Sequence, residues 1–138
     1  MVCCEARGKE LGRNVSVNNP LISVVDDDTS MSRMLCRVIR SAGLEVLSFR
    51  SAEEFLNSNR TNDVACLILD INLPGISGID LQQQLKDSGV AIPTIFISGK
   101  APEDFQQKAL NAGAVGFFRK PFSIDSLLTT VRTVISPA

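Results

Sequence analysis

Five short apolar runs, each followed by a segment with helical periodicity, constrain what this chain can fold into. Short runs rich in branched residues, such as 64–69, are typical of strands buried on both faces of a sheet. Strands that alternate with helices form a parallel sheet, because right-handed crossovers place the helices on its two faces. We predict strands over residues 21–25, 44–49, 64–69, 91–97 and 114–119.

The intervening segments carry start and stop signals for helices. Ser51 and Glu54 form the S-x-x-E pattern of a capping box. Pro102 suits the first turn of a helix that Gly113 closes, and Ser123 can cap the last helix. The predicted fold class is therefore α/β, a doubly wound (βα)5 arrangement in three layers. The run 44–49 contains charged and polar residues and is the expected edge strand.

Composition bounds the domain count and the partners. The 138 residues suffice for one compact domain, and a formal net charge of −1 argues against direct nucleic-acid binding. No apolar run reaches membrane-spanning length, and the charged first ten residues do not resemble a signal peptide, so we expect a cytoplasmic protein. Residues 1–19 lack a sustained period and are predicted to be a flexible leader before a domain over 20–138.

The chain contains no histidine, which excludes Ser-His-Asp catalysis, His-ligated zinc and a phosphohistidine carrier. Any chemistry must depend on carboxylates, hydroxyls, lysine or thiols. The four cysteines form no C-x-x-C pair, and we expect them to be reduced and structural. They are Cys3, Cys4, Cys36 and Cys66.

Polar residues follow the predicted strands: Asp26 and Asp27, then Asp70, Ser98 and Lys120. The carboxyl ends of parallel strands meet at one edge of a sheet, where α/β proteins bind ligands. Two carboxylates about 4 Å apart repel by about 4 kcal/mol at an effective dielectric of about 20, so the cluster needs a cation or a proton. Hard carboxylate oxygens favour Mg²⁺.

A single aspartate at a strand end is more simply explained as a solvated loop residue or a helix cap. Acids, a hydroxyl and a lysine at four strand ends form a pattern that capping does not require. A carboxylate can attack a phosphoryl donor and form an acyl phosphate when a metal and a lysine neutralise the developing charge. Asp70 suits this nucleophilic role.

Four segments resemble, in order and spacing, the receiver domain of bacterial two-component response regulators. They are VVDDD at 24–28, LDINLPGISG at 69–78, FISGK at 96–100 and FFRKPF at 117–122. The resemblance spans about residues 20–136. It implies a flavodoxin-like sheet of strand order 2-1-3-4-5. It also implies a phosphoacceptor whose only chemistry is Mg²⁺-dependent self-phosphorylation and slow self-dephosphorylation, rather than an enzyme.

The resemblance assigns roles to the metal-site residues. Asp70 would be the phosphoacceptor and a metal ligand, Asp27 a direct Mg²⁺ ligand, and Asp26 an acid acting on the metal through water. Asn72 would contribute its backbone carbonyl. The third consecutive acid, Asp28, has no counterpart in the family pattern, and a surface or helix-capping role remains open for it.

The resemblance also implies a phosphoryl contact and a switch. Ser98 would donate its hydroxyl to a phosphoryl oxygen, and Lys120 would contact the phosphoryl group. The peptide bond between Lys120 and Pro121 is expected to be cis. Phe117 takes the aromatic switch position, often Tyr in the family, so it can change rotamer with Ser98 but has no hydroxyl to donate.

The implied partners are a sensor histidine kinase or phosphotransfer protein and a downstream effector domain or protein. The kinase would contact Ser30, Met34 and Phe122. Phosphorylation would favour dimerisation or partner binding through the helix before Gly113, the fifth strand and the last helix, with transcription as the output by analogy with receivers joined to helix-turn-helix domains. Candidate members of this surface are Gln106, Gln107, Phe117 and Arg119.

Three other functions are compatible with parts of this pattern. A flavodoxin-like cofactor binder is disfavoured because three acids after the first strand would repel a phosphate. An aspartate-nucleophile phosphatase would need a second acid, whereas Asp70 is followed by Ile71 and Asn72. The third alternative is a receiver-like interaction module that works without phosphorylation, against which the complete set of site residues argues.

Overall fold

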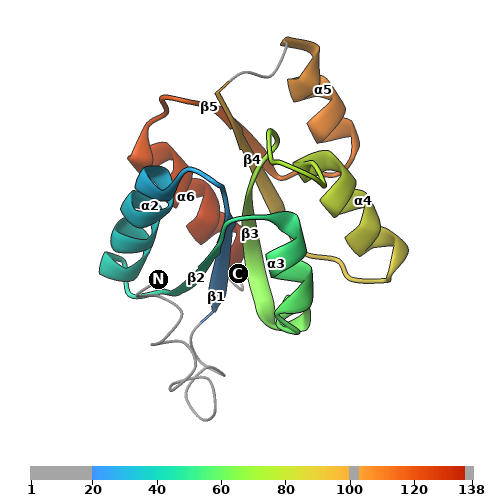
Figure 1. Cartoon of the computed structure of the whole chain (residues 1–138). Coiled ribbons are helices and arrows are strands. Elements are labelled where there is room, and N and C mark those ends of the chain that lie inside the picture. Colours follow the sequence, from blue (N-terminus) through green and yellow to red (C-terminus); the bar gives the residue numbers. More distant parts are fainter. Residues whose placement is uncertain (1–19, 100–102, 136–138) are drawn as a thin grey trace.

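The computed structural model describes residues 20–99 and 103–135, and it contains a five-stranded parallel sheet of order β2-β1-β3-β4-β5 (Figure 1). The predicted fold class and strand order are confirmed. The strands are β1 (Leu21–Val25), β2 (Glu45–Phe49), β3 (Val64–Asp70), β4 (Thr94–Ser98) and β5 (Gly116–Arg119). The helices are α2 (Thr29–Ser41), α3 (Ala52–Asn57), α4 (Gly78–Asp87), α5 (Glu103–Asn111) and α6 (Ile124–Ile135).

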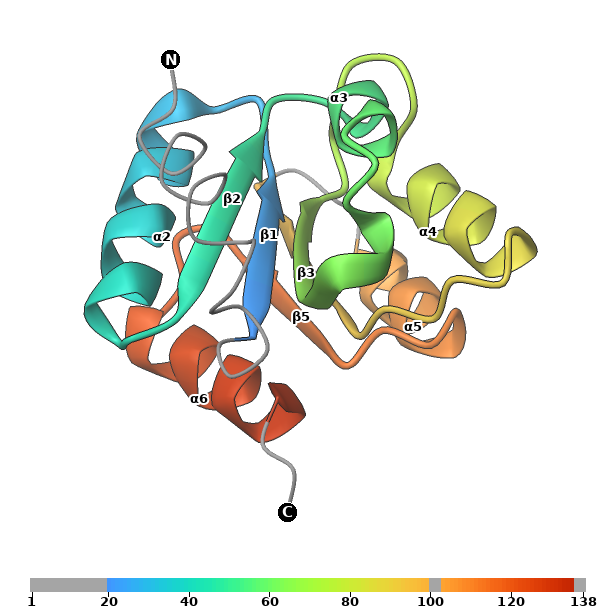
Figure 2. The ribbon, with the colours of Figure 1, turned by 90° about the horizontal axis from the view of Figure 1, so that it is seen from below.

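The sheet lies between two helical layers, with α2 and α6 on one face and α3, α4 and α5 on the other (Figures 1 and 2). Successive side chains of a strand point to opposite faces, so each strand contributes to two cores. In β4, Ile95 and Ile97 pack with the α2 and α6 layer, whereas Phe96 packs with the α3 to α5 layer. Every residue of β1 and β4 is buried, as expected of central strands in a doubly wound sheet.

β2 lies at the edge of the sheet, as predicted from its polar residues. Glu45 and Ser48 are only half-buried there, whereas Val46 and Leu47 are buried. β5 forms the opposite edge and none of its four residues is fully buried. The edge strands therefore leave polar side chains partly exposed, whereas the central strands bury theirs, as Ser23 of β1 and Thr94 of β4 show.

Two strands begin later than predicted by two or more residues, and one short helix was missed. β4 begins at Thr94 rather than at residue 91, because Pro93 has no N–H to donate; its carbonyl instead accepts from the Leu67 N–H at 2.9 Å. β5 begins at Gly116 rather than at residue 114. A 3-10 helix over Thr61–Asp63 was not predicted. The predicted helix start at Pro102 and the leader, with Cys3 and Cys4, lie outside the described residues.

The capping predictions are confirmed where the structure describes them. The Ser51 hydroxyl accepts from the Glu54 N–H at 3.1 Å, as in a capping box, whereas the Glu54 carboxylate accepts at 2.9 Å from the N–H of Arg50, one residue before the N-cap. Ser123 accepts from the Ser126 N–H at 3.2 Å at the start of α6. Within the described part of the chain, no helix has the length and apolar character needed to cross a membrane.

Cys36 and Cys66 are buried in the apolar core beneath α2 and α6, in agreement with the expected structural role. Burial raises the pKa of the Cys66 thiol to about 12, so this group is a neutral core residue at physiological pH.

Candidate functional site

Three carboxylates meet at the carboxyl edge of the sheet. Asp26 directly follows β1, Asp70 is the last residue of β3, and oxygen atoms of Asp26, Asp27 and Asp70 lie within 4.8 Å of one another. Asp26 is fully buried, Asp70 is 4% exposed, and Asp27 faces solvent. Three hard oxygen donors at this spacing can hold a metal ion, and one exposed member leaves the site open to water.

Lys120 supplies a cation to this cluster from beyond the end of β5. Its Nζ lies 3.1 Å from Asp26 Oδ2 and 3.4 Å from Asp70 Oδ2. The Lys120 backbone N–H donates to the Ser98 carbonyl at 2.8 Å, which fixes the base of the side chain against β4. The Lys120–Pro121 peptide bond is cis, as predicted.

Burial and charge shift the protonation of this pair. Burial raises the pKa of Asp26 to about 6, and the negative charge of Asp70 acts in the same direction. The Asp28 N–H, 2.9 Å from Asp26 Oδ1, and the Lys120 ammonium oppose this shift. Burial by itself would lower the pKa of Lys120, but hydrogen bonds and charge attraction from Asp26 and Asp70 outweigh it and raise that pKa. Lys120 is therefore a cation at neutral pH.

Asn72 joins the phosphoacceptor candidate to the hydroxyl at the end of β4. Its backbone N–H donates to Asp70 Oδ1 at 2.9 Å, and its side-chain Oδ1 accepts from Ser98 Oγ at 2.8 Å. The sequence assigned Asn72 only a backbone role. A side-chain bond between residues 26 positions apart leaves no signal in a single sequence, because it depends on how the loop after β3 returns to the sheet.

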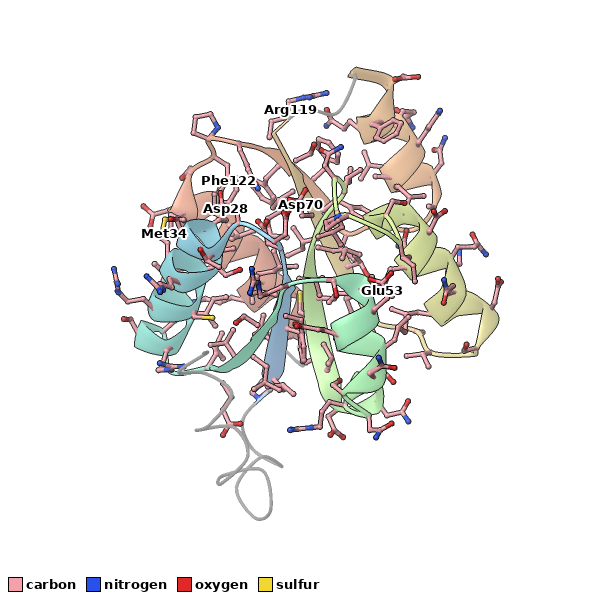
Figure 3. All side chains as sticks on the ribbon, in the orientation of Figure 1. Asp28, Met34, Glu53, Asp70, Arg119 and Phe122 are labelled. Atoms are coloured by element: carbon pink, nitrogen blue, oxygen red, sulfur yellow. The ribbon has the colours of Figure 1, made fainter. Side chains whose placement is uncertain are left out.

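The loop after Asp70 is held in a tight return. Its ends are joined by the Gly78 N–H, which donates to the Ile71 carbonyl at 3.1 Å. A Cβ at Gly78 would lie 2.5 Å from the Asp70 carbonyl oxygen, so only glycine fits at this position. Glu53 of α3 braces the outer side, since its carboxylate accepts from the Ile76 N–H at 3.3 Å (Figure 3 labels Glu53 and Asp70).

Asp28, the acid with two open roles, caps α2. Its Oδ1 accepts from the N–H groups of Ser30 at 3.0 Å and Met31 at 3.3 Å. Asp28 therefore takes the helix-capping role, whereas Asp26 and Asp27 belong to the cluster of carboxylates.

Phe117 lies in β5, paired in register with Phe96 of β4. Two residues further along, Ser98 pairs with Arg119, so Phe117 and Ser98 belong to the same face of the sheet. The Phe117 ring is half-buried against the α3 to α5 layer, and its centroid lies 5.5 Å from the Arg119 guanidinium carbon. This placement is compatible with a switch between buried and exposed rotamers.

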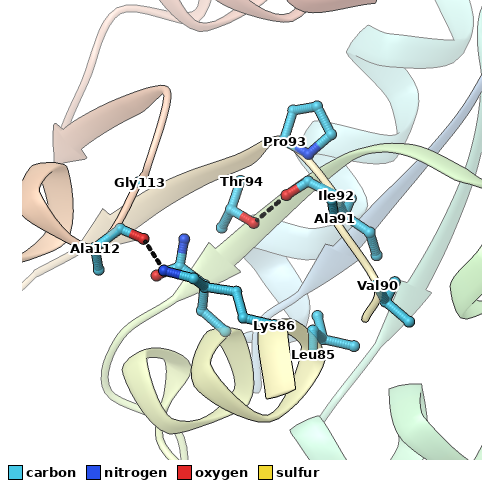
Figure 4. Close-up of a pocket in the computed structure, with 10 residues that line it drawn as sticks. Leu85, Lys86, Val90, Ala91, Ile92, Pro93, Thr94, Ala112 and Gly113 are labelled. Atoms are coloured by element: carbon cyan, nitrogen blue, oxygen red, sulfur yellow. Dashed lines mark hydrogen bonds between the residues drawn. The ribbon is translucent and has the colours of Figure 1, made fainter. Parts of the chain in front are cut away.

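A cavity of about 310 Å³ lies at the other end of β4, between the end of α4 and the turn after α5 (Figure 4). Thr94, the first residue of β4, lines it, whereas Ser98, the last, belongs to the acid cluster. Its walls are largely apolar, and Lys86 Nζ donates to the Ala112 carbonyl at 3.2 Å at its rim. The cavity is therefore separate from the charged site.

Comparisons with known proteins agree with this geometry. The response regulator receiver domain family model matches residues 22–132. The response regulator protein TodT of Pseudomonas putida is 43% identical over 126 residues, covering 91% of this chain and 56% of TodT. The transcriptional regulatory protein FixJ of Bradyrhizobium diazoefficiens is 32% identical over 117 residues, covering 85% of this chain and 57% of FixJ.

The solved structure of the response regulator StyR superposes with a TM-score of 0.79 at 39% identity, over 85% of this chain and 59% of StyR. The chain thus spans little more than half the length of these relatives, and the similarity concerns their receiver portion. Since the family model covers most of the chain and a solved relative shares its fold, the chain belongs to the receiver domain family of two-component response regulators.

Proposed function

We propose that Asp70 accepts a phosphoryl group from a sensor histidine kinase or phosphotransfer protein in the presence of Mg²⁺. The observation that carries this proposal is the meeting of Asp26, Asp27 and Asp70 with Lys120 at one edge of the sheet. Buried carboxylates in contact destabilise a fold, so their concentration here favours a functional explanation over a structural one.

The donor set fits Mg²⁺, which prefers carboxylate and carbonyl oxygens and retains several waters. Asp27 and Asp70 would hold it directly, Asp26 through water, and Asn72 through its backbone carbonyl. When bound, the ion supplies positive charge that neutralises phosphoryl oxygens.

The protein's own residues account for the transfer step. An Asp70 carboxylate oxygen forms the new P–O bond while the P–N bond to the donor histidine breaks, and the departing imidazole keeps that electron pair and takes a proton from solvent. The Lys120 ammonium, which already contacts Asp70 Oδ2, stabilises charge on the phosphoryl oxygens. Ser98 would donate its hydroxyl to one of these oxygens.

The docking surface for the donor would include Ser30, Met34 and Phe122. Ser30 is exposed, and Met34 and Phe122 are half-buried beside the acid edge, where Figure 3 labels them near Asp28. Partly exposed apolar side chains next to the phosphoacceptor suit a protein partner that must bring its histidine to Asp70.

The proposed output surface is formed by α5, β5 and α6, with Gln106, Gln107 and Arg119 exposed and Phe117 half-buried. Leu110 of α5 and Val115, just before β5, add apolar area, since they are 41% and 44% exposed. Phosphorylation would shift an existing equilibrium toward dimerisation or partner binding there. Sedimentation before and after activation tests the dimer, and an unchanged coefficient would leave only the partner-binding version.

The proposed downstream response is control of transcription through an effector domain or protein. The support is the relationship to FixJ, which is named a transcriptional regulatory protein and is longer than the matched region. The formal net charge of −1 does not favour direct binding of this chain to DNA, so the effector would make that contact.

Intact-protein mass after incubation with Mg²⁺ and a small-molecule phosphodonor tests the phosphoacceptor role. We expect one added phosphoryl group in the wild type, none in Asp70→Asn, and none after chelation of the metal. Asp28→Asn is the matched control, since it changes a nearby carboxylate that caps α2, and it should still be labelled. A wild type without an adduct at short times, and without binding of a stable phosphoryl mimic, would favour the phosphorylation-independent interaction module.

A further inference from the structure

A continuous chain of hydrogen bonds links the proposed phosphoacceptor to the hydroxyl of β4. Asp70 Oδ1 accepts from the Asn72 backbone N–H at 2.9 Å, and Asn72 Oδ1 accepts from Ser98 Oγ at 2.8 Å. Both distances lie in the range of well-formed hydrogen bonds. One residue, Asn72, therefore contacts both the proposed phosphoacceptor and the hydroxyl that would donate to the phosphoryl group.

The Ser98 hydroxyl has one proton and can donate it to one acceptor at a time. Its backbone position is fixed, because its carbonyl accepts from the Lys120 N–H at 2.8 Å and the residue pairs with Arg119 of β5. Ser98 is fully buried, so the hydroxyl can redirect its proton only by a local rotation of the side chain. Donation to Asn72 therefore competes with donation to a phosphoryl oxygen.

We propose that the Asn72 side chain is a positioning residue that holds Ser98 in the resting arrangement, and that phosphorylation of Asp70 makes the Ser98 hydroxyl exchange Asn72 for the phosphoryl group. This inference rests on the proposed phosphoacceptor function. It gives the amide of Asn72 a regulatory task distinct from the metal contact proposed for its backbone carbonyl.

The chain of bonds also explains how the two events are connected. Formation of the acyl phosphate removes the negative charge of the Asp70 carboxylate, which weakens the bond from the Asn72 N–H. The loop that carries Asn72 is then less strongly held at the moment when a phosphoryl oxygen competes for the Ser98 proton. Asn72 is exposed, so water could satisfy its amide if the bond to Ser98 were broken. The bond therefore matters mainly for the position of the buried Ser98 hydroxyl.

A double-mutant cycle in the metal-free protein tests the resting bond without any phosphoryl chemistry. Asn72→Ala, Ser98→Ala and the double variant are unfolded in urea. If the two side chains share a hydrogen bond, the unfolding equilibrium constant of the double variant should differ by about fivefold from the value expected when the effects of the two single substitutions are multiplied. Asn111→Ala is the control partner for Ser98→Ala, because it removes an amide oxygen that accepts from Gln107 at 3.0 Å in α5. The effects of Asn111→Ala and Ser98→Ala on the unfolding constant should simply multiply. Multiplicative effects for Asn72 and Ser98 would overturn the inference.

Beryllofluoride, a stable phosphoryl mimic, tests the exchange of partners in the presence of Mg²⁺. Loss of the resting acceptor should let Asn72→Ala bind the mimic about fivefold more tightly than wild type. The same substitution should have no effect in a Ser98→Ala background, because the hydroxyl that it acts on is gone. The inference would be overturned if Asn72→Ala bound the mimic no more tightly than wild type, or if it raised the affinity equally in the Ser98→Ala background. Either result would leave the proposed phosphoacceptor function intact. A wild type that binds no mimic would contradict the proposed function, and the exchange with it.

Discussion

The interior of the sheet and its carboxyl edge are equally buried but opposite in chemistry. In the interior, Ile68 and Phe96 are fully enclosed by apolar neighbours. At the edge, Asp26, Asp70 and Ser98 are enclosed to the same degree, with exposures of 0%, 4% and 0%. Burial of an apolar side chain stabilises the fold, whereas burial of a carboxylate opposes it unless a partner compensates. Buried groups that oppose folding are therefore concentrated at the carboxyl edge, which is the proposed phosphorylation site.

Truncation of an interior residue should produce the largest change in stability. Phe96→Ala removes a fully buried ring from the core beneath α3, α4 and α5, and we expect a loss of about 4 kcal/mol in the free energy of unfolding. Urea unfolding monitored by circular dichroism measures it.

The control is Phe122→Ala, which truncates a half-buried ring near the edge and should lose about 1 kcal/mol. Similar losses for Phe96→Ala and Phe122→Ala would contradict the contrast between interior and edge.

The interior of the sheet was predictable because burial leaves a local pattern. Continuous apolar runs identified the five strands, and the acids that follow them identified the edge where they meet. The prediction was wrong where a local feature interrupted a run, as when Pro93 delays the start of β4 to Thr94. The site residues came from strand ends and from family resemblance.

The contacts among the site residues were not predictable, because the loop after β3 and the turn after β5 set them. The bond between Ser98 and Asn72, and the position of Lys120 between Asp26 and Asp70, join residues far apart in the sequence. Neither leaves a periodic signal. Residue type indicated what these groups can do, and only the fold shows which of them meet.

Removal of a buried charge at the edge should increase the free energy of unfolding, whereas truncation of an interior side chain decreases it. Asp26→Asn removes a charge that burial disfavours and also relieves its repulsion with Asp70, and we expect a gain of about 2 kcal/mol in the free energy of unfolding at pH 7 in the metal-free protein. The pKa of Asp26 is about 6 in the folded protein against an ordinary value of 3.8. Between these pH values the folded state therefore keeps a proton on Asp26 that the unfolded state releases. The stability of the wild type therefore falls as pH rises through this window.

The difference between Asp26→Asn and wild type should consequently shrink from pH 7 to pH 4. Other carboxylates titrate in both proteins and cancel in the comparison. Chemical denaturation at several pH values, with chelator present, measures the difference. A gain that is constant from pH 4 to pH 7 would show that repacking of the amide, rather than the charge of Asp26, stabilises the variant.

The smallest expected effect separates two neighbouring acids of the edge. Asp28 accepts from two N–H groups at the start of α2, and loss of an N-cap costs about 1 kcal/mol, so Asp28→Ala should destabilise the protein by that amount. Asp27 is exposed beside two other carboxylates, and Asp27→Ala should change stability by less than about 0.5 kcal/mol.

The affinity for Mg²⁺ should respond in the reverse order, because Asp27 faces the cluster and the Asp28 carboxylate caps α2. Titration of Mg²⁺ by isothermal calorimetry gives this second readout. If Asp28→Ala weakened the metal more than Asp27→Ala, the division of structural and functional roles between these two acids would be wrong.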